Sequence, residues 1–130
     1  MLKKIIGFLL MSLPAAAFSQ PPDCSKFREG KFRIADTRAG VVTIADRRGG
    51  YQTESSEALK AIVRFKITWQ DNCTYTLRID KVLRNENKID FPYNKEVHVK
   101  IIATGTDSYT HETSSSMTNG TYNVVVTKIN

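Results

Sequence analysis

The stretch KAIVRFKITWQDNCTYTLRID, from Lys60 to Asp80, decides the fold class of this chain. Its first half alternates apolar and polar residues with a period of two, which is the period of a β-strand with one buried face. Its second half alternates in the same way after the turn residues Gln70, Asp71 and Asn72. The stretch therefore predicts an antiparallel hairpin with a three-residue loop. The expected inner face of the hairpin consists of Ala61, Val63, Phe65, Ile67, Trp69, Cys73, Tyr75, Leu77 and Ile79.

The predicted loop also sets the register of the hairpin. It places Trp69 opposite Cys73, with the apolar residues of both strands on one side. On the polar side it places Arg64 opposite Arg78, and directly opposed like charges cost stability unless something compensates them. Two interpretations follow. The two arginines form an anion-binding site for a carboxylate, a phosphate or an acidic glycan, or they are neutralised diagonally by Asp80 and by acids of the next strand.

Shorter segments with the same period flank the hairpin, separated by turn residues such as Gly49-Gly50 and Asn119-Gly120. No segment has a helical period, apart from one possible turn between Ser55 and Leu59. About eight short strands in a row predict an all-β, antiparallel up-and-down meander, which protects its edges best by curling into a barrel. The expected architecture is a small lipocalin-like barrel, with a two-sheet β-sandwich as the alternative. The expected strands are residues 31–35, 41–46, 51–55, 60–69, 73–80 with an extension over 81–84, 96–104, 108–113 and 121–129.

The first 19 residues have the features of a secretory signal peptide. Lys3 and Lys4 form the positive start, an apolar stretch follows over residues 5–11, and Ala17 and Ser19 suit a cleavage site before Gln20. The apolar stretch is shorter than the roughly 20 residues of a transmembrane helix. We therefore expect residues 20–130 to form a single secreted β domain, without a membrane span, in the periplasm or outside the cell.

Cys24 and Cys73 are the two cysteines of the chain. Export brings cysteines into an oxidising compartment, where an even number of them in a small domain favours a disulfide. Closing a loop of this length stabilises a fold by roughly 4 kcal/mol in the chain-entropy model. No metal site is expected, because His98 and His111 lie far from both cysteines and lack ligand spacing.

Composition and motifs argue against several classes of function. The chain has 19 Lys and Arg against 13 Asp and Glu, a net charge of +6, and the positive residues are scattered, so nucleic-acid binding is not expected. The sequence has no Gly-x-Ser-x-Gly elbow and no phosphate-binding loop. We interpret His98 and His111 as exposed strand residues rather than catalytic bases. The chain is therefore expected to be a monomer that is not an enzyme and needs no cofactor.

Three segments, residues 24–32, 52–54 and 69–77, resemble a group of small exported proteins of Bacteroidota. The segment WQDNCTYTL, which begins at Trp69, carries most of this resemblance. Gly30-Lys31-Phe32 is also similar to the Gly-x-Trp motif that opens lipocalins, with Phe32 in place of the tryptophan. The resemblance implies an exported domain of lipocalin-like barrel architecture. Some members carry a topoisomerase label, but a chain of 130 residues has no room for the modules of such an enzyme.

Non-catalytic binding is the function that we expect of such a barrel. A barrel of this size is either filled by its own side chains or holds one small ligand. The bulky inward residues favour a filled core, and a modest pocket at one end is the alternative, lined by Trp69, Tyr75, Tyr109 and Tyr122. The expected partner is a small apolar ligand or a protein of the cell envelope. A secreted hydrolase inhibitor acting through the loop from Asn85 to Tyr93 is a further alternative.

Overall fold

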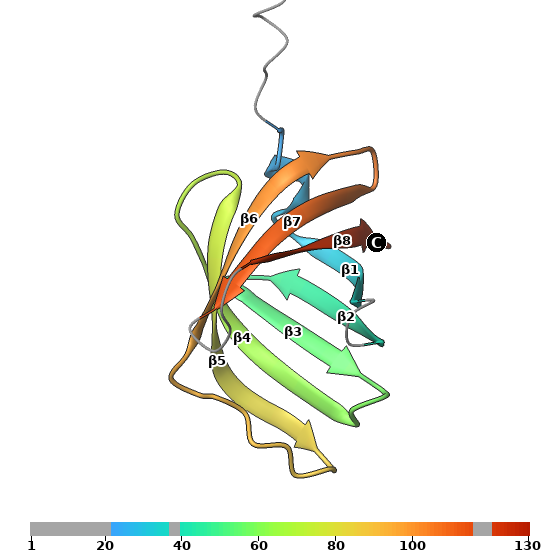
Figure 1. Cartoon of the computed structure of the whole chain (residues 1–130), viewed down its shortest axis with the longest axis vertical. Coiled ribbons are helices and arrows are strands. Elements are labelled where there is room, and N and C mark those ends of the chain that lie inside the picture. The colour runs from blue at the N-terminus through green and yellow to red at the C-terminus, as the bar shows by residue number, and fades with distance from the viewer. Residues whose placement is uncertain (1–21, 37–39, 116–120) are drawn as a thin grey trace, which may run out of the picture.

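The computed structural model describes residues 22–36, 40–115 and 121–130, and these form one turn of 3-10 helix and eight strands. Each strand pairs in antiparallel fashion with the next, and β8 pairs with β1, so the sheet closes into a barrel (Figure 1). The predicted all-β, up-and-down, lipocalin-like barrel is confirmed, and the two-sheet alternative is wrong. The elements are η1 (Ser25–Phe27), β1 (Gly30–Asp36), β2 (Val41–Arg48), β3 (Tyr51–Ser56), β4 (Ala61–Trp69), β5 (Thr74–Asn85), β6 (Glu96–Thr104), β7 (Ser108–Ser115) and β8 (Tyr122–Lys128).

The ends of the strands follow the alternation of the sequence closely. Predicted and observed bounds differ by at most two residues, because the turn residues that interrupt the alternation also end the strands. The predicted turn at Asn119-Gly120 and the predicted signal peptide lie outside the described residues. Within the described ranges, no helix is long and apolar enough to cross a membrane.

The predicted register of the β4–β5 hairpin is wrong by two residues. Trp69 pairs with Tyr75 rather than with Cys73. The Asp71 carboxylate accepts a hydrogen bond from the Cys73 backbone N–H at 2.9 Å, within a turn that is two residues longer than the predicted one. Because the slip is an even number of residues, the apolar side chains stay inside the barrel. The slip gives Arg78 a new partner, Lys66, and a register shift between Arg64 and Phe65 pairs Arg64 with Lys81.

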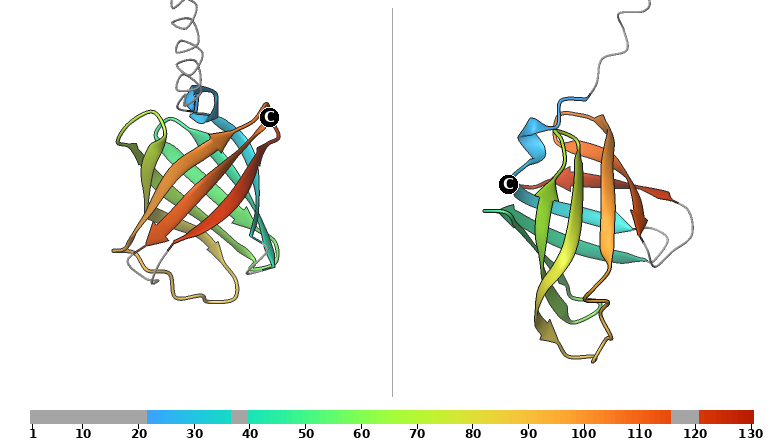
Figure 2. Two further views of the ribbon diagram at one scale, coloured as in Figure 1. Left: turned by 45° about the horizontal axis from the view of Figure 1, so that its top comes forward. Right: turned by 90° about the vertical axis from the view of Figure 1, so that its left-hand side faces the viewer.

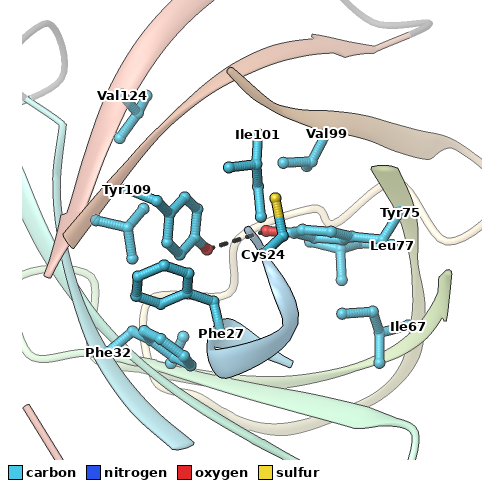
Figure 3. Packing of buried hydrophobic residues seen from close by; sticks show 12 residues of the cluster. Cys24, Phe27, Phe32, Ile67, Tyr75, Leu77, Val99, Ile101, Tyr109 and Val124 are labelled. Carbon is cyan, nitrogen blue, oxygen red and sulfur yellow. Dashed lines mark hydrogen bonds between the residues drawn. The ribbon is translucent and has the colours of Figure 1, made fainter. Parts of the chain in front are cut away.

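One end of the barrel is closed by the segment that contains η1. This segment lies across the barrel end that also holds the β4–β5 and β6–β7 turns (Figure 2). A disulfide joins Cys24 to Cys73 of the β4–β5 turn, with their Cα atoms 5.4 Å apart. Phe27 is fully buried, and its ring centroid lies 5.0 Å from that of Tyr109 (Figure 3). The N-terminal segment is therefore part of the core. The disulfide also suggests an oxidising compartment.

Candidate ligand-binding cavity

A buried arginine lies directly beneath η1. Arg47 follows the inward Ala45 on β2, and its side chain is only 1% exposed. Its Nη1 donates to the backbone carbonyl of Phe27 at 2.6 Å, and its Nε donates to Gln52 Oε1 at 2.8 Å. Its Nη2 donates to the hydroxyl oxygens of Tyr75 and Tyr109, at 3.2 and 2.9 Å. One side chain thus links η1 to strands β3, β5 and β7.

Aromatic rings surround the same guanidinium group. Its central carbon lies 4.5 Å from the ring centroid of Phe32 and 5.0 Å from that of Tyr75, distances at which a cation is attracted to the face of a ring. Among the described residues, no carboxylate forms a direct ion pair with Arg47. Glu54 reaches it only through Gln52, whose Nε2 donates to Glu54 Oε2 at 2.7 Å. The positive charge is therefore held by hydrogen bonds and ring faces, which leave it few free donors.

The barrel interior contains a cavity of about 210 Å³. It lies toward the end where β1 ends and β2 begins, away from η1. Part of its wall is apolar and part is polar, as in most small-molecule sites. The apolar part consists of Ile34, Phe65, Leu77, Val97, Val99 and Val124, and the polar part consists of Asp36, Thr43, Gln52, Glu54, Tyr75, His111, Thr113 and Tyr122. Side chains therefore fill the interior at the end beneath η1 and leave a cavity toward the other end. This arrangement corresponds to the modest pocket at one end, the expected alternative to a filled core.

The polar wall offers many hydrogen-bond acceptors. Burial raises the pKa of Glu54 above its ordinary value, although the hydrogen bond from Gln52 and the charge of Arg47 act in the opposite direction. Burial, assisted by Arg47, lowers the pKa of His111 to about 4, so its imidazole is neutral at pH 7. His111 Nδ1 and Thr113 Oγ1 are buried without a hydrogen-bond partner in the described part of the chain. Such atoms carry a free-energy cost that a bound donor would remove.

Two of the four aromatic residues expected at a ligand site line the cavity, and three of the four surround Arg47. Tyr75 and Tyr122 line the cavity. Tyr109 belongs to the closed end, where its hydroxyl lies 3.3 Å from that of Tyr75. Trp69 is also at the closed end, half-buried, with the Arg28 guanidinium 4.4 Å from its ring centroid. Trp69, Tyr75 and Tyr109 thus gather around Arg47, and Tyr122 lies apart from them on the cavity side.

Sequence reasoning missed several residues of this interior. His98 is exposed as expected, but the expectation for His111 is wrong, because its side chain is only 7% exposed. The signal was present, since Tyr109, His111 and Thr113 occupy alternate positions of one strand and so share a face. Arg47 and Glu54 were missed because charged residues are rarely placed inside a barrel by pattern alone.

The two candidate anion-binding arginines have acidic partners on the outer surface. Arg64 Nη2 lies 2.7 Å from Asp80 Oδ2, and Arg78 Nη2 lies 3.2 Å from Glu96 Oε2 on the adjacent strand β6. This is the arrangement that the neutralisation interpretation describes. The loop after β5 is ordered by Asn85, whose side chain forms two hydrogen bonds of 2.8 Å with the backbone of Ile89. Tyr93, further along this loop, is 57% exposed.

Comparisons with known proteins return no match to this chain, whether with protein-family models, curated proteins or solved structures. Across residues 22–36, 40–115 and 121–130, no group of His, Cys, Asp and Glu side chains is arranged to hold a metal ion. Fold and site therefore define a class: an eight-stranded barrel, closed at one end by its N-terminal segment, with a cavity of mixed polarity in the other half.

Proposed function

We propose that this chain is an exported, non-catalytic binding protein that holds one small ligand inside its barrel. The cavity of about 210 Å³ is the observation that carries the proposal. It combines a continuous apolar wall with a few polar groups, and ligand sites of barrels are built in this way. The apolar wall supplies affinity, and the polar groups orient the ligand.

The size of the cavity limits the ligand. An engineered protein cavity of about 150 Å³ holds benzene, whereas sites for drug-sized molecules span roughly 300–1,000 Å³. A cavity of about 210 Å³ therefore suits a molecule with one ring and a short substituent. A long-chain lipid would not fit. The ligand class is thus narrower, and more polar, than a generic apolar molecule.

Two observations support the exported location. The disulfide between Cys24 and Cys73 is a feature of proteins from oxidising compartments. Residues 1–19 have the charge and hydropathy pattern of a signal peptide. The resemblance to small exported proteins of Bacteroidota agrees with both. We therefore propose that the protein acts in the periplasm or outside the cell.

A cavity-filling variant tests the proposal. Val97→Phe places a ring in the cavity wall, and Val125→Phe adds the same ring on the outer surface, where Val125 is 55% exposed. Binding of single-ring probes is measured by ligand-observed NMR with the disulfide intact, after circular dichroism has shown that both variants fold. We expect Val97→Phe to abolish binding and Val125→Phe to retain it. If no probe binds the native protein, or if Val97→Phe binds equally well, the proposal is wrong.

The loop between β5 and β6 supports a second candidate, inhibition of a hydrolase. Asn85 fixes the start of this loop, and Tyr93 is exposed, a combination suited to insertion into a cleft. The test is a panel of proteases and glycosidases assayed with the native protein and with Tyr93→Ala. Inhibition that Tyr93→Ala abolishes would support this function, and a panel without inhibition would count against it.

A further inference from the structure

We propose that the cavity selects a small organic cation, an arylalkylamine with one ring, whose ammonium group binds Glu54 and whose ring packs on Phe65 and Leu77. This inference rests on the proposed binding function and adds the class of ligand. The charge of the cavity wall is its first support. Glu54 contributes a carboxylate to the cavity wall, and the described lining includes no Lys or Arg.

The nearest positive charge does not make the cavity a site for anions. Arg47 donates to Phe27, Gln52, Tyr75 and Tyr109, and its guanidinium is enclosed by ring faces. Gln52 stands between it and Glu54. An anion in the cavity would meet the carboxylate of Glu54 and would find four of the five N–H donors of Arg47 already used. A cation would meet an acceptor that lacks a direct positive partner.

Polar atoms of the cavity wall that have no hydrogen-bond partner also favour a ligand that donates hydrogen bonds. Thr113 and His111 are each 7% exposed, and Thr113 Oγ1 and His111 Nδ1 have no partner in the described part of the chain. Both residues line the cavity together with Glu54. An ammonium group has three N–H donors and no acceptor, so its chemistry matches a wall in which acceptors predominate. Burial raises the pKa of Glu54, and a bound cation would stabilise the ionised carboxylate.

The apolar part of the wall, on the neighbouring strands β4, β5 and β6, favours an aromatic ring. Phe65, Leu77 and Val97 form an apolar surface, and Tyr75 and Tyr122 add two aromatic side chains. Aromatic rings pack well against each other at offset or edge-to-face geometry, and ring faces also attract the ammonium group. A ring with a short aminoalkyl arm would therefore contact both this apolar surface and Glu54 within about 210 Å³.

Three probes with one ring and different head groups test the inference: benzylammonium, benzyl alcohol and benzoate. Dissociation constants are measured by isothermal titration calorimetry at pH 7 on the native, disulfide-bonded protein. We expect benzylammonium to bind on the order of tenfold more tightly than benzyl alcohol, as for a hydrogen bond to a charged group. We expect no measurable binding of benzoate.

Variants then assign the selectivity to Glu54. Glu54→Gln should reduce benzylammonium affinity to that of benzyl alcohol, with benzyl alcohol itself unchanged. Glu96→Gln, which removes a carboxylate from the outer surface, is the matched control and should behave as the native protein. Thr113→Val, which removes one unpartnered acceptor with little change of shape, should weaken benzylammonium severalfold, and it provides a second variant if Glu54→Gln does not fold.

The outcomes separate this inference from the proposed function. If benzyl alcohol or benzoate binds as tightly as benzylammonium, the cation inference is wrong and the binding function stands. If Glu54→Gln folds and keeps the preference for benzylammonium, Glu54 is not the recognition group and the inference is likewise wrong. If none of the three probes binds, both the inference and the proposed function are overturned.

Discussion

Arg47 is the residue on which the closed end of the barrel depends. A buried cation is costly unless hydrogen bonds replace its hydration, and Arg47 has four such acceptors on separate parts of the chain. Burial raises the pKa of Tyr75 well above its ordinary value, so its hydroxyl stays protonated at neutral pH. The network therefore consists of one fixed charge and neutral partners. It joins η1 to the strands without any direct ion pair in the described residues.

Replacing Arg47 by Met should destabilise the protein strongly. The change leaves the Phe27 carbonyl and Gln52 Oε1 without their buried donor, and each unsatisfied group costs about 1–3 kcal/mol. We expect the free energy of unfolding, measured by urea denaturation, to fall by at least about 3 kcal/mol. Arg48→Met is the matched control, because the Arg48 side chain is 73% exposed, and it should change stability by no more than about 0.5 kcal/mol. Equal effects of the two substitutions would contradict the role given to Arg47.

Single residues of the site were the hardest part to predict from the sequence. The alternation of β7 places His111 inside, but a histidine among threonines and a glutamate has the composition of an exposed strand. For Arg47, alternation with Ala45 is the only sequence signal, and the hydrogen-bond partners that permit its burial come from four other elements, η1, β3, β5 and β7. Satisfaction of a buried polar group is a property of the tertiary structure, so a local pattern does not contain it.

At the scale of elements, closure of the barrel depends on the start of β1. β1 and β8 share three paired positions, Phe32 with Lys128, Arg33 with Thr127 and Ile34 with Val126. Three backbone hydrogen bonds extend this short seam: Lys31 N–H donates to the Asn130 carbonyl at 2.9 Å, and the N–H groups of Ile129 and Asn130 donate to the Lys31 carbonyl at 2.8 and 3.3 Å. Gly30 lies beside them with φ of +131°, a backbone conformation that side chains disfavour.

Gly30→Ala should therefore weaken the seam. A Cβ at this position would lie 2.9 Å from the Asn130 carbonyl oxygen and 2.8 Å from Lys128 Cε. The backbone conformation alone costs about 1–3 kcal/mol for a residue with a Cβ, and we expect a loss of stability in this range or above it in thermal unfolding. Gly105→Ala serves as the control, since its Cβ would make only ordinary contacts with Ser108, and it should be nearly neutral. A neutral result for Gly30→Ala would show that the seam adapts without cost.

Elements were more predictable than residues because their signals are local and redundant. Each strand repeats its alternation several times, and a turn residue marks each boundary, so one ambiguous position does not change the prediction of the strand. The register between strands was predicted less accurately than their bounds. The predicted β4–β5 pairing is displaced by two residues, because the Asp71 side chain stabilises a different turn. Both registers bury the same apolar face, so hydrophobic patterning alone does not distinguish them.

At the scale of the whole molecule, the fold follows from strand number and edge protection, but the cavity does not. Closure of eight strands sets the interior width, and the side chains then decide how much of it is filled. The inner residues of the β4–β5 hairpin are bulky and favour a filled core. The aromatic residues instead gather around Arg47 at the closed end, where Phe32, Tyr75 and Tyr109 of three strands meet η1, and the cavity lies in the part of the interior that they leave open.

The titratable groups inside the barrel make the stability of the whole molecule depend on pH. His111 has an ordinary pKa of 6.5 and a pKa of about 4 inside the barrel. Between these pH values the unfolded chain binds a proton at His111 that the folded barrel does not bind. Lowering the pH through this window therefore favours unfolding. Glu54 acts in the opposite direction, because its raised pKa lets the folded state bind a proton at a higher pH than the unfolded chain.

Comparison with a variant separates the two groups. Native protein and His111→Gln share Glu54, Asp36 and Arg47, so their difference in unfolding free energy reports on His111. Urea denaturation at pH 7.5 and near pH 4 should show that the native protein loses up to about 3 kcal/mol more than His111→Gln on acidification. His98→Gln, which removes a histidine from the outer face of β6, is the matched control and should follow the native protein. If the native protein and His111→Gln lost the same unfolding free energy on acidification, protonation of a group other than His111 would cause the loss.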